Sequence, residues 1–180
     1  MKRRLVIAVF AVLMVSPPAF ADCSDAPCAS VQKLLQARPG NFAKVRGKPA
    51  LDPRGDPVWQ GTQPIAGLID YCYINKRGEA GRYEYRCETQ ASESLDKSKQ
   101  IAAAVKAAFK AVEPNIEWFD DPATVSLAEL EGFHGTEGWY GGFPKNKTVI
   151  VKIATIASGN FGSVTSVTLF AKPLPRRDLR

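Results

Sequence analysis

The chain has 180 residues, of which 45% are hydrophobic and 23% are charged, with a formal net charge of +6. This length suits one domain. Much of the basic excess lies at the two ends, in residues 2–4 and 176–180. Because no basic stripe is interleaved with aromatic residues along one element, the composition argues against nucleic-acid binding.

Residues 1–21 have the features of a cleaved signal peptide. A basic start precedes the apolar run Leu5–Val15, and the segment ends in Ala-Phe-Ala at residue 21. The apolar run is about half the length of a bilayer-spanning helix, so we expect no integral membrane segment after cleavage. Asp22 separates the cleavage site from Cys23 without a lipoprotein motif. We therefore expect a periplasmic or secreted protein with a single α+β domain at 22–172 and a basic flexible tail at 173–180.

Four cysteines follow the predicted cleavage site: Cys23, Cys28, Cys72 and Cys87. In an exported chain this number favours disulfides over thiol or metal chemistry. Three pairings are possible, and we favour Cys23 with Cys28 and Cys72 with Cys87. With one histidine in the chain and no Cys-x-x-Cys spacing, a zinc site is disfavoured. We expect neither a metal nor a cofactor.

The first predicted element is a short helix that begins at Pro27 or Ala29. Val31, Leu34 and Leu35 recur at helical spacing, Ser30 is a candidate cap, and Pro39-Gly40 ends the pattern. Residues 47–67 then hold four prolines and several glycines, which predicts a loop. Within it, residues 58–60 could form a short edge strand, with Trp59 covering the core.

Residues 68–88 are typical of a β-hairpin, with two alternating Tyr, Ile and Cys runs around Gly-Glu-Ala-Gly. We expect Cys72 to lie opposite Cys87, Ile74 opposite Tyr85, Asn75 opposite Glu84 and Gly78 opposite Gly81. This register predicts one apolar face (Leu68, Cys72, Ile74, Tyr83, Tyr85, Cys87) and one face that carries Tyr71, Tyr73, Asn75, Arg82, Glu84, Arg86 and Glu88.

Residues 92–112 give the clearest helical period in the chain. Their apolar residues recur at three and four, Ser92 or Ser94 can cap the start, and Pro114 ends the pattern. Residues 116–119 are a candidate short strand, and the state of 124–133 is left open between helix and strand.

The last predicted hairpin joins 148–157 to 163–172. It places Val149, Val151 and Ile153 on one face of its first strand, and Val167, Leu169 and Ala171 on one face of its second. The predicted fold is therefore α+β, with an antiparallel sheet built from two hairpins, one long helix across a face and a short N-terminal helix.

Residues 132–144 combine glycines with aromatic side chains, and we interpret this segment as a loop. Rigid aromatic rings supply contact area at low entropic cost, so His134, Trp139, Tyr140 and Phe143 are the candidate binding residues. The competing interpretation is that these rings fold inward as a cover for the sheet.

A catalytic alternative uses the acidic residues near this segment. Asp120, Asp121, Glu129 or Glu131, together with His134, could supply the paired carboxylates of a hydrolase that acts on envelope polymers. No Gly-x-Ser-x-Gly nucleophile elbow is present, and we assign no catalytic residue. The sequence favours an exported, disulfide-stabilised protein without catalytic activity that binds a protein or a cell-envelope component, with an immunity or inhibitor protein as the sharper hypothesis.

Overall fold

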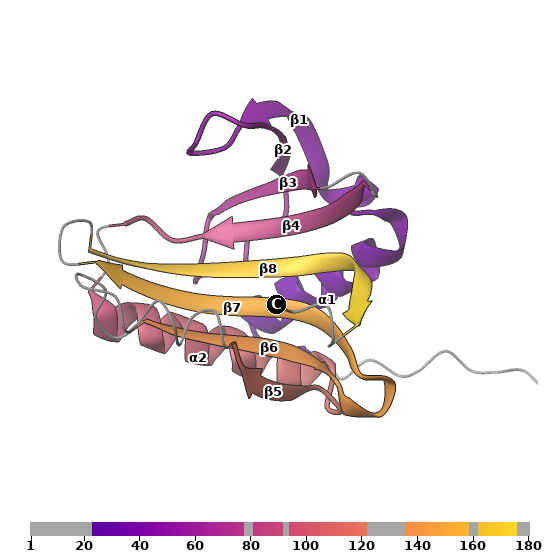
Figure 1. Cartoon of the computed structure of the whole chain (residues 1–180), viewed down its shortest axis with the longest axis vertical. Coiled ribbons are helices and arrows are strands. Elements are labelled where there is room, and N and C mark those ends of the chain that lie inside the picture. The colour runs from indigo at the N-terminus through magenta and orange to yellow at the C-terminus, as the bar shows by residue number, and fades with distance from the viewer. Residues whose placement is uncertain (1–22, 78–80, 92–93, 122–135, 159–161, 176–180) are drawn as a thin grey trace, which may run out of the picture.

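The structure is a computed structural model that describes residues 23–77, 81–91, 94–121, 136–158 and 162–175 (Figure 1). Predictions that concern residues 1–22, His134, Glu129 and Glu131 lie outside this described part. Its elements in chain order are α1 (Ala26–Ala37), the 3-10 turns η1 (Arg38–Gly40) and η2 (Ala43–Val45), β1 (Arg46–Leu51), β2 (Pro57–Gly61), β3 (Tyr71–Arg77), β4 (Arg82–Glu88), α2 (Leu95–Val112), β5 (Glu117–Asp120), β6 (Glu137–Phe143), the 3-10 turn η3 (Pro144–Asn146), β7 (Thr148–Ser158) and β8 (Gly162–Pro175).

The described strands form one antiparallel sheet in the order β1-β2-β3-β4-β8-β7-β6-β5. The α+β class is confirmed. The sheet is larger than the predicted one, which consisted of two hairpins only. Among the described elements, a helix followed by four consecutive strands occurs twice in the chain. The two four-strand units join where β4 pairs with β8, with Tyr85 opposite Leu169 (Figure 1).

The predicted register of the β3–β4 hairpin is confirmed. Cys72 lies opposite Cys87, Ile74 opposite Tyr85 and Asn75 opposite Glu84. Gly78 lies outside the described residues, so its pairing with Gly81 remains a prediction. Both favoured disulfides are present, Cys72–Cys87 across the hairpin and Cys23–Cys28 at the start of α1. No cysteine is free.

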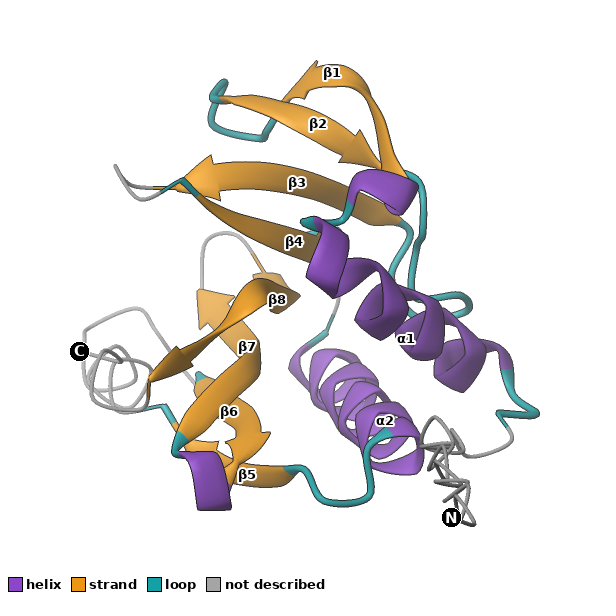
Figure 2. Cartoon of the chain, turned by 90° about the vertical axis from the view of Figure 1, so that its right-hand side faces the viewer, coloured by secondary structure: helices purple, strands orange, loops and turns teal. Residues whose placement is uncertain are grey.

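Both helices lie on the same side of the sheet (Figure 2). Helix α1 starts earlier than predicted because Asp25, not Ser30, caps it, with Asp25 Oδ1 accepting the Cys28 N–H at 2.7 Å. Ser94 caps α2 by accepting the Lys97 N–H. None of the helices in the described part is long and apolar enough to cross a membrane.

The main core fills the space between these helices and the sheet. We call this side of the sheet the inner face and the opposite side the outer face. The largest fully buried side chains come from both helices, from strands in both halves of the sheet and, in the case of Phe42, from the connection between η1 and η2: Val31, Leu34, Phe42, Ile74, Tyr85, Phe109, Ile153 and Leu169.

Residues 47–67 were predicted to form a loop. In the structure they contain most of β1 and all of β2. Pro49 is tolerated since β1 is an edge strand, where a missing N–H need not remove a ladder bond. Strand β2 is therefore not the edge, and β1 shields it. Trp59 is half-buried against the main core, as expected of a cover residue.

Two differences concern the β7–β8 hairpin. The register shifts between Val149 and Val151, so Val149 leaves the predicted face and joins a second apolar cluster with Tyr140 and Phe170. Strand β8 also continues through Pro175, which pairs with Thr148. The first three residues of the predicted flexible tail thus belong to the sheet.

Candidate functional site

The glycine- and aromatic-rich segment is a strand rather than a loop where the structure describes it. Residues 137–143 form β6, and the strand separates the predicted binding residues onto two faces. Trp139 and Phe143 pack against the main core, whereas Tyr140 belongs to the second cluster on the outer face. Trp139 also lies under the Lys106 ammonium group, 4.2 Å from its ring centroid. Trp139, Tyr140 and Phe143 therefore do not form one shared binding surface.

The side chains of the neighbouring residues Asp120 and Asp121 also lie on opposite faces of the sheet. Asp121 is fully buried, and its carboxylate pairs with Lys152 Nζ at 2.5 Å beside Tyr140 on the outer face. Asp120 is exposed and acts electrostatically on Lys106 of α2, which lies on the inner side. The two carboxylates thus do not converge as an acid/base pair. In the described part, no three His, Cys, Asp or Glu side chains form a group that could hold a metal ion.

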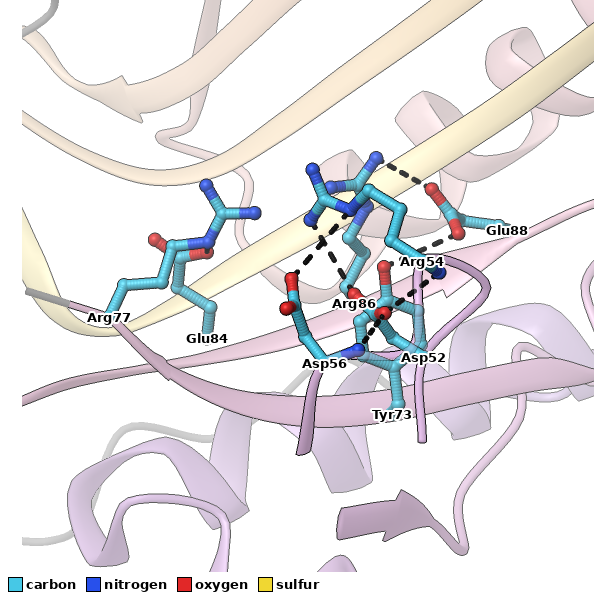
Figure 3. Close-up of polar contacts among 8 residues, drawn as sticks. All are labelled: Asp52, Arg54, Asp56, Tyr73, Arg77, Glu84, Arg86 and Glu88. Carbon is cyan, nitrogen blue, oxygen red and sulfur yellow. Dashed lines mark hydrogen bonds and ion pairs between the residues drawn. The ribbon is translucent and has the colours of Figure 1, made fainter. Parts of the chain in front are cut away.

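A polar surface on the outer face of β3 and β4 is the most organised candidate site. Figure 3 shows its charged side chains, which come from the β1–β2 turn and from the hairpin. We call this surface the outer-face patch and define it as Asp52, Arg54, Asp56, Tyr71, Tyr73, Arg86 and Glu88. At the far end of the same hairpin, Arg77 and Glu84 form a separate ion pair of 3.4 Å.

Asp52 builds the β1–β2 turn. Its Oδ1 accepts the backbone N–H groups of Arg54 and Asp56, each at 2.9 Å, and Gly55 adopts a positive φ of 87°. The Asp56 N–H is the main cause that lowers the pKa of Asp52, opposed by desolvation and aided by Arg54. The turn presents Arg54 with 62% of its side chain exposed, and the Arg54 guanidinium lies 3.5 Å from Asp52 Oδ2.

The hairpin supplies a second ordered group, centred on Glu88. Tyr73 Oη donates to Glu88 Oε2 at 3.3 Å, and Arg86 Nη2 pairs with Glu88 Oε1 at 2.6 Å (Figure 3). Tyr73 is almost fully buried, and burial raises its pKa to about 12, with Glu88 and Asp52 adding to the rise and Arg86 opposing it. Glu88 therefore fixes the positions of the Tyr73 hydroxyl and the Arg86 guanidinium through these two contacts.

Tyr71 lies beside this group and remains 45% exposed. Its ring centroid is 5.7 Å from that of Tyr73. Desolvation, followed by the charges of Glu88 and Asp52, raises the Tyr71 pKa above its ordinary value. A hollow of about 270 Å³ adjoins it, lined by Leu68, Ile69, Asp70, Tyr71, Glu88, Thr89 and Gln90.

Sequence reasoning placed four members of the patch on one face of the hairpin, but did not identify them as a site. The missing part was the β1–β2 turn, which lay inside the predicted loop. Asp52-Pro-Arg-Gly-Asp56 is a composition typical of a tight turn, and this signal could have marked residues 52–56 as an ordered projection.

Comparison of the chain with models of protein families, with curated proteins and with solved structures found no match. The functional interpretation therefore depends on the geometry and chemistry of these surfaces.

Proposed function

We propose that the chain is an exported binding protein without catalytic activity, and that it recognises another protein through the outer-face patch. One observation carries this proposal. Among the described residues, the large hydrophobic side chains that are exposed are Leu51, at 64%, and Tyr71, at 45%. Tyr71 lies beside Tyr73 in the outer-face patch. Leu51 does not belong to the patch, because the β1–β2 register pairs it with Pro57, on the face of the sheet that carries Trp59. An exposed apolar group within an ordered polar frame is typical of a protein interface.

The charge pattern favours a protein partner over a polyanion or a polycation. Asp52, Asp56 and Glu88 alternate with Arg54 and Arg86 across the patch, so neither sign of charge dominates. A polymer of one charge would meet repulsion at several points, whereas a protein surface can match both signs. Tyr and Arg are also the side chains most often found at the energetic centres of protein interfaces.

The rigidity of the surface supports an inhibitor- or immunity-type role. The Cys72–Cys87 bridge fixes the two strands that carry Tyr71, Tyr73, Arg86 and Glu88, and Asp52 fixes the turn. A preformed surface loses little conformational entropy on binding, which favours tight complexes. The two disulfides are compatible with export, as the N-terminal sequence predicts.

Site-specific photo-crosslinking tests this proposal. A photoreactive phenylalanine analogue would replace Tyr71 in one variant and Asp56, which is 71% exposed, in another, and the cells that make the protein would be irradiated. We expect both variants to yield the same covalent adduct with one partner protein. Lys33 and Gln36 are exposed positions on α1 and serve as matched controls that should yield no such adduct.

Two results would contradict the proposal. One is the absence of any adduct at Tyr71 and Asp56, and the other is an identical adduct at the α1 control positions. Substitution of Arg54 by Glu should reduce the yield of the adduct at Tyr71, because the turn would then present the opposite charge to the partner. An undiminished yield would limit the interface to the hairpin and exclude the turn.

A further inference from the structure

A second surface lies at the opposite end of the sheet order, where β5 begins and β6 ends. Two adjoining hollows of about 410 Å³ and 140 Å³ share Glu117, Phe143 and Pro144 as lining residues. We call them together the β5-end groove. Its other lining residues come from the end of α2, the α2–β5 connection, β5 and the β6–β7 turn: Lys110, Pro114, Asn115, Trp118, Phe119, Gly142, Lys145, Asn146, Lys147 and Thr148.

The charges of the groove are unbalanced. Lys110, Lys145 and Lys147 line it with Glu117 as the one acidic residue, and all four are exposed. Lys110 Nζ donates to the Ile116 carbonyl at 2.9 Å, which holds its positive charge at the wall of the groove. Phe143 and Pro144 add apolar surface between the basic groups. The groove therefore matches a ligand that carries both carboxylates and apolar side chains.

The adjoining edge of β5 indicates that this ligand is a polypeptide. Strand β5 ends the sheet order, and no strand in the described part pairs with its outer edge. The Asp121 N–H donates to the Gly138 carbonyl at 2.9 Å, toward β6. Because amide directions alternate along an antiparallel strand, the N–H groups of Trp118 and Asp120 point away from β6, toward this outer edge. Such an edge can accept an added strand.

We propose that the β5-end groove and the outer edge of β5 form a docking site for an extended, acidic segment of another polypeptide. The segment pairs its backbone with β5 and places its carboxylates near Lys110, Lys145 and Lys147. This site involves other residues than the outer-face patch, so the proposal stands or falls independently of the function proposed above.

Panning of a phage-displayed library of random dodecapeptides on the immobilised protein tests the inference. We expect the selected peptides to be richer in Asp and Glu than the input library. As synthetic peptides, they should bind the triple variant K110E/K145E/K147E at least roughly tenfold more weakly than the unsubstituted protein. The variant K33E/K44E/K172E makes the same change in net charge at exposed positions elsewhere and should bind normally.

Two further measurements separate strand addition from simple attraction between charges. Two peptides can be made from a selected sequence, one with its odd-numbered and one with its even-numbered backbone nitrogens methylated. Because only alternate N–H groups of an added strand point toward β5, one methylated peptide should lose binding and the other should keep it. A phosphodiester oligonucleotide should fail to displace the peptide. The inference is overturned if no acidic peptides are selected, if both triple variants lose affinity equally, if both methylated peptides bind, or if the oligonucleotide competes.

Discussion

The hydroxyl of Tyr85 is bonded to both backbone polar groups of Gln63: it donates to the carbonyl oxygen at 2.8 Å and accepts from the N–H at 3.0 Å. Tyr85 is fully buried in β4, and Gln63 lies in the connection from β2 to β3. This pair ties that connection to the core. Gly61 makes room for it, since a Cβ at residue 61 would lie 2.5 Å from the Tyr85 hydroxyl oxygen.

Ionisation of Tyr85 should therefore destabilise the fold at alkaline pH. Burial raises its pKa from 10.0 to about 12, although the hydrogen bond with Gln63 opposes the shift. Since the folded-state pKa exceeds the unfolded value, the stabilisation is complete below pH 10 and is lost as the pH rises toward 12. Urea unfolding across this range should show a falling free energy, and Tyr85→Phe should reduce the slope. An unchanged slope in Tyr85→Phe would contradict this assignment.

The two disulfides should differ in their contribution to stability. The cysteines of the Cys72–Cys87 pair are 15 residues apart and those of Cys23–Cys28 are 5 apart. The chain-entropy model assigns about 3 kcal/mol to the first loop and about 2 kcal/mol to the second. We expect urea unfolding of C72A/C87A to show the larger loss, increased by a cavity at two buried positions. A larger loss for C23A/C28A would contradict the order that loop length and burial predict.

The β3–β4 hairpin could be predicted from the sequence because local alternation and the two cysteines agree on one register. Strand β6 could not, because Gly138, Gly141 and Gly142 interrupt its pattern. Gly141 and Gly142 are required by tertiary contacts that no local pattern reveals. A Cβ at Gly141 would lie 2.7 Å from Val151 Cγ1 and 2.8 Å from Trp118 Cζ3. The same segment was interpreted as a loop because glycine is more common there.

The candidate site was harder to predict than the fold for a related reason. Alternation placed Tyr71, Tyr73, Arg86 and Glu88 on the outer face, but a face with mixed charges is usually only solvated. What distinguishes the outer-face patch is that the turn carrying Asp52 and Arg54 lies against it, and this is a non-local arrangement (Figure 3). The Trp139 and Tyr140 rings are adjacent in sequence, but a strand directs neighbouring side chains to opposite faces.

Loss of the Asp52 carboxylate should loosen the β1–β2 turn. Its Oδ1 accepts two backbone N–H groups, so Asp52→Ala leaves both without their partner and frees the backbone around Arg54. Limited trypsin digestion should then cleave after Arg54 markedly faster than in the wild-type protein. Asp56→Ala is the matched control, because the Asp56 side chain lies 4.0 Å from Arg54 Nε and is 71% exposed. Equal cleavage of both variants would mean that the Asp52 side chain does not hold the turn.

The Asp121–Lys152 ion pair should stabilise the junction of β5, β6 and β7 only as a complete pair. Asp121 is fully buried, so Lys152→Met would remove a cation from a carboxylate inside the protein. Removing one partner of a buried pair costs about 3–5 kcal/mol, and we expect a value near the lower end because the Lys152 side chain is 30% exposed. The double variant D121N/K152M removes both charges and should recover much of the loss in urea unfolding. If the double variant were less stable than K152M, the pair would not be the reason that Lys152 is needed, and its packing on the Tyr140 ring, 5.3 Å from the centroid, would be the stronger contribution.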